Sequence, residues 1–310
     1  MNVLVALDGS PHATEVIRFL NAFPLPEETH FTCLTVIPPL RHAWMDLLMA
    51  DETEGDSLSD SRTKQAQEAL AKATVPLTVG DGQPELIVRE GDAAEQILEA
   101  AKAHRSVLIV MGTQGKSSLE RLLLGSVSQR VTRFASCSVL VVRPGGSASA
   151  PRPSDTAHKA LRLLLAVDAS PYAREAVNFI DGLSLKDRAQ LALCHVVETA
   201  SQAHDAAVYS MWLRFRSELR IQANATLSEL AQSMEGGQIK PETILCEGEP
   251  AAEIVAAARQ HKADLLVIGH KGESDVDSFP LGGLAAKLIH HTPCSILVVR
   301  KPENTAQHGR

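Results

Sequence analysis

A glycine-rich segment in the first half of the chain has the composition of a phosphate-binding loop. Gly112 and Gly115 follow an apolar run, and nine residues later Gly125 and Ser126 stand at a predicted helix start. Glycines let the backbone approach a ligand closely, and the free N–H groups and dipole of a helix start favour an anion. The hydroxyls of Ser126 and Ser128 can add hydrogen bonds. The alternative is that these glycines only end a strand and begin a helix, and that interpretation stays open here.

Two better-known phosphate-binding patterns do not describe this segment. Gly115-Lys116-Ser117 looks like the end of a Walker A loop, but that loop requires a glycine five positions before its Gly-Lys pair. Val110 stands at that position. The chain also lacks the Gly-x-Gly-x-x-Gly fingerprint of dinucleotide-binding folds.

Asp8 is a second candidate for ligand contact, because it is a polar residue at the end of the apolar run 3–7. Ligands of open parallel sheets lie at the carboxyl ends of the strands, so a contact between Asp8 and a ligand is the favoured hypothesis. The alternative is a turn acid at the start of the next helix, a role for which Ser10 competes. Asp168 holds the same position in the second half.

The second half of the sequence repeats the first. Residues 3–11 recur as 163–171, residues 137–143 recur as 294–300, and the glycine loop recurs between them. The period is too long for a solenoid, whose units have roughly 20–50 residues. The Pro-, Gly- and Ser-rich stretch between the copies is typical of a linker. The predicted division is a first domain at 1–145, a linker at 146–159, a second domain at 160–302 and a tail at 303–310.

Each copy alternates short apolar runs with helix-like stretches. In the first copy, strands are predicted at 3–7, 31–37, 86–88, 107–111 and 139–142. Helices are predicted from Ser10-Pro11 to about residue 23 and at 61–73, 92–104 and 126–135. Nearly continuous apolar strands indicate burial on both faces. The order therefore predicts a doubly wound α/β fold with a parallel sheet in each domain.

Composition excludes several classes of function. Thirty basic and 37 acidic residues give a net charge of -7, which argues against binding nucleic acid or an anionic membrane surface. No apolar run approaches the ~18 residues of a membrane span, and the start MNVLVALDGS does not resemble a signal peptide. The five cysteines are scattered and never form Cys-x-x-Cys, which predicts reduced thiols and a cytoplasmic protein. They are Cys33, Cys137, Cys194, Cys246 and Cys294.

On these residues the chain resembles a tandem universal stress protein. The nucleotide motif of that family is Gly-x2-Gly-x9-Gly-(Ser/Thr), and Gly112, Gly115, Gly125 and Ser126 fit it at every position. The resemblance implies two five-stranded parallel sheets of strand order 3-2-1-4-5 with helices on both faces, and a site for ATP with Mg²⁺. It also implies the nucleotide-binding residues, which are Ala6, Leu7, Asp8, Val36, Met111, Gly112, Gly115, Gly125, Ser126, Val127 and Ser128.

The second copy departs from the motif. Gly283 stands where the family has Ser or Thr, and Ala285 replaces Ser128. A hydrogen bond to a charged group contributes about 1.5–3 kcal/mol, so its loss predicts ATP binding at least about tenfold weaker. The first copy departs at Val107, where the second has Asp264, and little functional effect is expected. The predicted weaker site comprises Asp168, Val196, Ile268, Gly269, Gly272, Gly282 and Gly283.

The sequence offers no catalytic or metal-binding set. A Gly-x-Ser-x-Gly nucleophile elbow is absent, and the adjacent His290 and His291 would point about 100° apart on a helix. We therefore expect a protein that is not an enzyme and acts in a stress response through nucleotide-dependent conformational or association change. Two rival hypotheses are a slow Mg-dependent ATPase or nucleotide transferase, and an interaction module that binds no nucleotide.

The last strand of each copy leads to a prediction about assembly. If the strand order follows the family, residues 138–143 and 295–300 form outer strands, and exposed strand edges need pairing or protection. We expect the two domains to pair through these strands within one chain, with any homodimer built on other surfaces.

Overall fold

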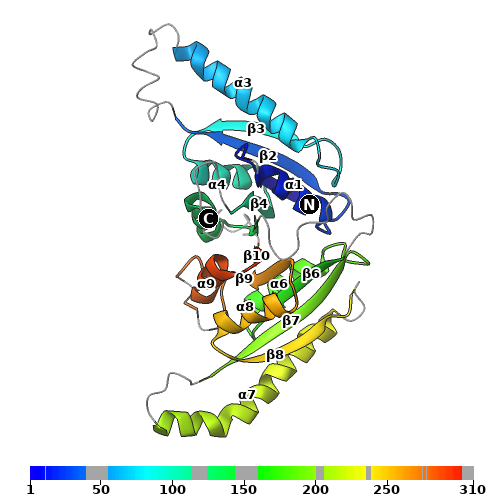
Figure 1. Ribbon diagram of the computed structural model, residues 1–310, viewed down its shortest axis with the longest axis vertical. Coiled ribbons are helices and arrows are strands. Elements are labelled where there is room, and N and C mark those ends of the chain that lie inside the picture. Colours follow the sequence, from blue (N-terminus) through cyan, green and yellow to red (C-terminus); the bar gives the residue numbers. More distant parts are fainter. Residues whose placement is uncertain are drawn as a thin grey trace, which may run out of the picture. The chain divides into compact units, whose positions relative to one another are not determined.

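The computed structural model describes most of the chain as two compact units, one before residue 144 and one after residue 159 (Figure 1). The described residues are 1–10, 12–39, 55–113, 124–143, 160–199, 206–234, 239–273, 275–276 and 278–301. At 55–59 and 206–214 the backbone alone is described. The predicted linker at 146–159 and tail at 303–310 lie outside these ranges, so the exact domain boundaries stay a prediction.

The first unit is built on five parallel strands in the order β3-β2-β1-β4-β5, as predicted. These are β1 (Asn2–Ala6), β2 (His30–Ile37), β3 (Glu85–Glu90), β4 (Leu108–Gly112) and β5 (Ser138–Val142). In the central strand β1, Val5 pairs with Cys33 on one side and with Val110 on the other. All three side chains are fully buried, which explains why the strands are apolar throughout.

Helices cover both faces of this sheet. They are α1 (His12–Ala22), α3 (Gly55–Thr74), α4 (Ala93–Ala103) and α5 (Ser126–Phe134). α1 and α3 contact each other, as do α4 and α5, so each pair shares one face. The apolar spacing of Val16, Ile17 and Leu20 buries one side of α1. The fold is the doubly wound α/β domain that the sequence predicts.

The second unit repeats this architecture with the strand order β8-β7-β6-β9-β10. Its strands are β6 (Leu161–Ala166), β7 (Ala189–Glu198), β8 (Glu242–Gly248), β9 (Leu265–Gly269) and β10 (Ser295–Val299). Its helices are α6 (Pro171–Asp181), α7 (Ala206–Ser233), α8 (Pro250–Gln260) and α9 (Gly283–His291). α7 has 28 residues and α3 has 20, which is the main difference in length between equivalent helices.

The two copies begin their first helix differently. In the second unit, the Ser170 hydroxyl accepts a hydrogen bond from the Ala173 N–H at 3.1 Å, and Pro171 follows it. The sequence predicts this arrangement for Ser10 and Pro11 of the first copy. In the first unit, the Ser10 carbonyl accepts from the Ala13 N–H at 3.0 Å, but the buried Ser10 hydroxyl has no partner among the described residues. The predicted side-chain cap is therefore wrong for Ser10 within the described chain.

An ion pair ties β6 to the loop before β9. The Asp264 carboxylate accepts from the Arg162 backbone N–H at 2.8 Å and lies 3.2 Å from a terminal guanidinium nitrogen of Arg162. The Asp264 side chain is 5% exposed and that of Arg162 is 20% exposed. At the equivalent place in the first unit stand Asn2 and Val107, which keep the backbone hydrogen bond between these segments at 3.0 Å.

The cysteines are free, and four of the five are buried. Burial raises the pKa of the Cys33 thiol to about 12 and also raises the pKa of Cys194. Within the ranges described above, no helix combines the length and the apolar composition that a membrane span requires.

Candidate functional site

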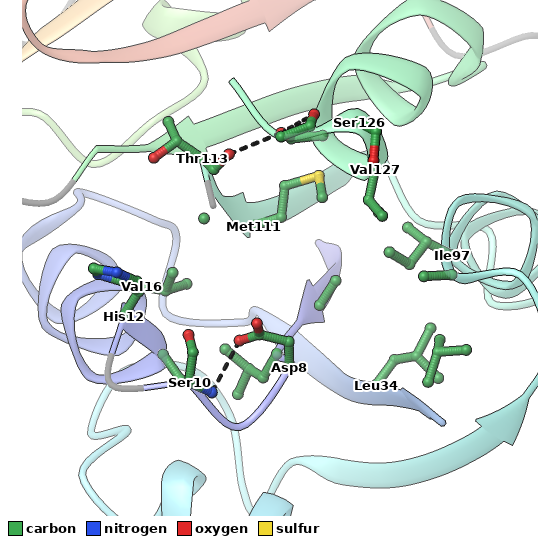
Figure 2. A pocket seen from close by; sticks show the side chains of 18 residues that line it. Asp8, Ser10, His12, Val16, Leu34, Ile97, Met111, Thr113, Ser126 and Val127 are labelled. Carbon is green, nitrogen blue, oxygen red and sulfur yellow. Dashed lines mark hydrogen bonds between the residues drawn. The ribbon is translucent and has the colours of Figure 1, made fainter. Parts of the chain in front are cut away.

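A cavity of about 260 Å³ opens in the first unit at the carboxyl ends of β1 and β4 (Figure 2). It lies where an open parallel sheet reverses its strand order, which is the usual ligand position in this architecture. Its described lining comprises Ala6, Leu7, Asp8, Ser10, His12, Ala13, Val16, Leu34, Val36, Ala93, Ile97, Met111, Gly112, Thr113, Gly125, Ser126, Val127 and Ser128.

The structure brings together ten of the eleven residues predicted for the first site. Strand ends contribute Ala6, Leu7, Asp8, Val36, Met111 and Gly112, and the start of α5 contributes Gly125, Ser126, Val127 and Ser128. Gly115 lies outside the described residues. That these side chains and backbone groups bind a ligand stays a prediction.

Asp8 and Ser10 place two unsatisfied oxygens at one side of the cavity (Figure 2). Asp8 Oδ1 accepts the Ser10 N–H at 3.0 Å, which fixes the carboxylate at the end of β1. Asp8 Oδ2 and Ser10 Oγ are both buried, and neither has a hydrogen-bond partner in the described part of the chain. A buried acceptor without a partner is costly, so these oxygens fit a ligand that donates hydrogen bonds.

The start of α5 faces Asp8 across the cavity (Figure 2). Gly125 is its N-cap residue, and a glycine has no side chain with which to cap the helix. The Gly125 N–H donates to the Thr113 carbonyl at 2.7 Å, which joins the helix to the end of β4. The next N–H groups lack helical partners by geometry, and the helix dipole makes this end attractive to an anion.

Ser128 has a different role from the one expected. Its buried hydroxyl lies 3.1 Å from the Thr113 carbonyl and 2.9 Å from the Gly125 carbonyl. A hydroxyl has one proton to donate, and here two backbone acceptors compete for it. The hydroxyl therefore ties α5 to β4, so the expectation that it is available to phosphates is corrected.

Sequence reasoning predicted the lining from α5 but missed most of the lining at the starts of α1 and α4. These residues are Ser10, His12, Ala13, Val16, Ala93 and Ile97, together with Leu34 and Thr113 on or after strands. In a βαβ unit each helix begins at the edge where the preceding strand ends, so the first turns of α1 and α4 must lie there too. Ala13 and Val16, three apart on one helical face, carried that signal.

The second unit has a larger cavity, of about 540 Å³, at the equivalent edge. Asp168, Val196, Ile268, Gly269 and Gly272 line it, as predicted from the sequence. Gly282 and Gly283 are absent from its described lining. The Gly283 N–H donates to Asp275, which does line the cavity, and the predicted role of the two glycines in binding stays a prediction.

Carboxylates bind the backbone N–H groups of the second glycine loop. The Asp275 carboxylate accepts from the Gly272 N–H at 2.7 Å and from the Gly283 N–H at 3.1 Å. Asp168 accepts from the Ser170 N–H at 3.0 Å and, with its other oxygen, from the Glu273 N–H at 2.9 Å. The loop donors available to a ligand are correspondingly fewer.

Two histidines beside this loop have lowered pKa values. Burial lowers the pKa of His195, against the opposing effect of the Asp168 and Glu273 carboxylates. The pKa of His270 falls to about 4, first because the ring is buried and then because Arg300 and Lys271 are nearby. The described residues contain no group of three or more His, Cys, Asp or Glu side chains that could hold a metal ion.

The low pKa of His270 predicts a loss of stability in acid. The unfolded chain binds a proton at the ordinary value of 6.5, whereas the folded chain binds it near 4. The free energy of unfolding should therefore fall as the pH falls from 6.5 to 4. His270→Thr, which installs the first-domain residue, should flatten this dependence in urea unfolding at pH 7, 6, 5 and 4.

His195 contributes a smaller effect of the same sign, so the slope should diminish rather than vanish in His270→Thr. His291→Gln, on the exposed end of α9, controls for the loss of a histidine elsewhere in the domain. An unchanged slope in His270→Thr would show that this ring does not carry the effect.

Comparison with known proteins identifies the class to which this fold and site belong. The model of the universal stress protein family matches residues 1–143 and 160–300. A universal stress protein of Mycolicibacterium smegmatis is 24% identical over 317 residues, covering 96% of each chain. One from Methanocaldococcus jannaschii is 32% identical over 139 residues, covering 45% of this chain and 75% of its own.

A solved structure shares the complete two-domain fold. The crystal structure of a universal stress protein from Archaeoglobus fulgidus has 20% sequence identity and a TM-score of 0.63, covering 96% of this chain and 98% of its own. The protein therefore belongs to the universal stress protein family. Its two matched regions are tandem domains of that family, as the internal repeat predicts.

Proposed function

We propose that this universal stress protein binds ATP in its first domain and acts through a nucleotide-dependent change of conformation or association. One observation carries the proposal. The unsatisfied oxygens of Asp8 and Ser10 lie across one cavity from the uncapped start of α5. A ligand with hydroxyl donors at one end and an anion at the other matches this arrangement, and a nucleotide is such a molecule.

The lining divides into regions that suit the parts of ATP. Leu34, Ile97 and Met111 supply apolar surface for a base. The Asp8 carboxylate suits the ribose hydroxyls, and the backbone at Gly125 and Ser126 suits the phosphates. Mg²⁺ fits as an ion carried by the phosphates, since it is commonly bound through substrate phosphates with few protein ligands.

Binding without turnover is the preferred form of this proposal. Asp8 and His12 are the titratable side chains in the described lining, and Asp8 is assigned to the sugar. General-base catalysis needs a titratable side chain positioned at the attacking water, and His12 is the remaining candidate for that role. A slow Mg-dependent ATPase or a nucleotide transferase is the first rival, and an interaction module without nucleotide is the second. We also propose a cytoplasmic location, since free, mostly buried thiols suit a reducing compartment.

Calorimetry on the full chain tests the proposal. We expect one equivalent of ATP to bind in the presence of Mg²⁺, more tightly than GTP. A phosphate-release assay on the same sample should show no turnover beyond the protein-free rate. No heat at millimolar ATP with folded protein would favour the nucleotide-free module, and sustained phosphate release would favour the enzyme.

A further inference from the structure

The glycine loop of the second domain holds an anion of its own. Asp275 lies in the loop between β9 and α9, and its two carboxylate oxygens accept the N–H groups of Gly272 and Gly283. These are the backbone donors that the motif would offer to a phosphate, one from the loop and one from the first turn of α9. The carboxylate satisfies them at 2.7 and 3.1 Å.

Gly282 has a steric role that follows from this carboxylate. A Cβ atom added at Gly282 would lie 2.0 Å from Asp275 Oδ2, far inside contact distance. The φ angle of Gly282 is -72°, which any residue can adopt. Glycine at this position therefore leaves the space that the Asp275 carboxylate fills, and a larger residue would displace that carboxylate.

The aspartates at the ends of β1 and β6 also differ in whether their second carboxylate oxygen accepts a hydrogen bond. Asp8 Oδ2 has no partner among the described residues of the first domain. Its counterpart in the second domain, Asp168 Oδ2, accepts the Glu273 N–H at 2.9 Å. The loop of the second domain thus also closes the sugar side of the equivalent site by an internal hydrogen bond.

The loop sequences differ in charge at four positions. Counted from the shared glycine, Glu273 stands where the first domain has Lys116, and Asp275 stands where it has Ser118. Lys271 and Ser278 stand where the first domain has Gln114 and Arg121. With the acidic residues Glu120 and Asp277 included, the formal charge is +1 over residues 113–124 and -2 over residues 270–281. This difference opposes the entry of a polyphosphate into the second cavity.

We propose that Asp275 is an internal anion that occupies the phosphate position of the second domain and closes that domain to nucleoside triphosphates. This inference rests on the proposed function, because the proposed nucleotide site of the first domain defines where a phosphate would lie in the second. The sequence alone attributes weak ATP binding in the second domain to the hydroxyl that Gly283 lacks. The two explanations differ, because a hydroxyl restored at residue 283 would leave the Asp275 carboxylate in place.

ATP stoichiometry in the full chain tests this proposal. Equilibrium binding of ATP with Mg²⁺ is measured for the wild type, Asp275→Ala, Glu273→Ala and Gly283→Ser. Asp275→Ala frees both N–H groups and should add a second equivalent, bound at least about tenfold more tightly than any second equivalent of the wild type. Glu273→Ala removes the same charge from the same cavity but leaves the N–H groups occupied, so it should keep the wild-type stoichiometry. Gly283→Ser should do the same.

Several results would overturn the proposal. A folded Asp275→Ala protein that gains no second equivalent shows that the carboxylate is not the obstacle. Two tight equivalents in the wild type refute closure without any variant. If Asp275→Ala fails to fold, Asp275→Ser installs the shorter, uncharged residue that the first domain has at this position, and a folded Asp275→Ser protein that gains no second equivalent also refutes the proposal. A wild type that binds no ATP while Asp275→Ala binds one equivalent would sink the proposed function and leave this proposal standing.

Discussion

Replacement of Asp8 by alanine is expected to weaken ATP binding about 10- to 100-fold. The Asp8 Oδ2 atom is buried and has no partner among the described residues, so a ribose hydroxyl would supply its hydrogen bond. A hydrogen bond to a charged group contributes about 1.5–3 kcal/mol, which gives this range of affinity. Calorimetry on the full chain measures the change directly.

Asp168→Ala is the matched control, because the duplication places the same residue at the same strand end. Both oxygens of Asp168 already accept backbone N–H groups, so this variant should bind ATP like the wild type. Equal losses in the two variants would indicate a general effect on the sheet edges. Unchanged binding in Asp8→Ala would remove the sugar contact from the proposed site.

Replacement of Asp264 by valine should lower the free energy of unfolding of the second domain by about 3 kcal/mol. The substitution removes the partner of the Arg162 guanidinium and of the Arg162 backbone N–H, in a site where the carboxylate is 5% exposed. An unpaired charge left in a buried place is strongly destabilising. Urea unfolding followed by circular dichroism measures the effect.

The first domain supplies the rescue for this variant. It has Asn2 and Val107 at these positions and keeps the same backbone hydrogen bond. The double variant Arg162→Asn/Asp264→Val should therefore recover most of the loss. Glu229→Ala breaks an exposed ion pair with Arg174 and should cost at most about 1 kcal/mol. A double variant no more stable than Asp264→Val alone would contradict this account.

The fold was predictable because its signals are local and repeated. Apolar runs such as 3–7 and 107–111 indicate burial on both faces, and their alternation with helical stretches favours a parallel sheet between two helical layers. The first site was predictable for a related reason, since strand ends such as Asp8 and Met111 meet at one edge of the sheet. The matched family regions confirm the duplication that the sequence repeat indicated.

The side-chain contacts inside the two sites could not be predicted, because the spacing of residues in the sequence does not determine where a side chain lies. Asp275 reaches N–H groups three residues before it and eight residues after it, which requires the folded loop. Ser128 looks like a phosphate ligand in the sequence. In the folded chain its hydroxyl lies within hydrogen-bond distance of two backbone carbonyls, and the sequence pattern does not reveal these contacts. How the two domains pair stays a prediction from the sequence.

The thiols of Cys33 and Cys194 lie within the strands β2 and β7, where burial keeps them protonated. The thiolate is the form that reacts with oxidants, and reactivity also requires access. Peroxide should therefore leave both sulfurs unmodified while it oxidises exposed, acidic thiols on other proteins. At these two positions the chain therefore keeps its covalent structure through an oxidative burst, and a response to such a stress would not begin at either sulfur.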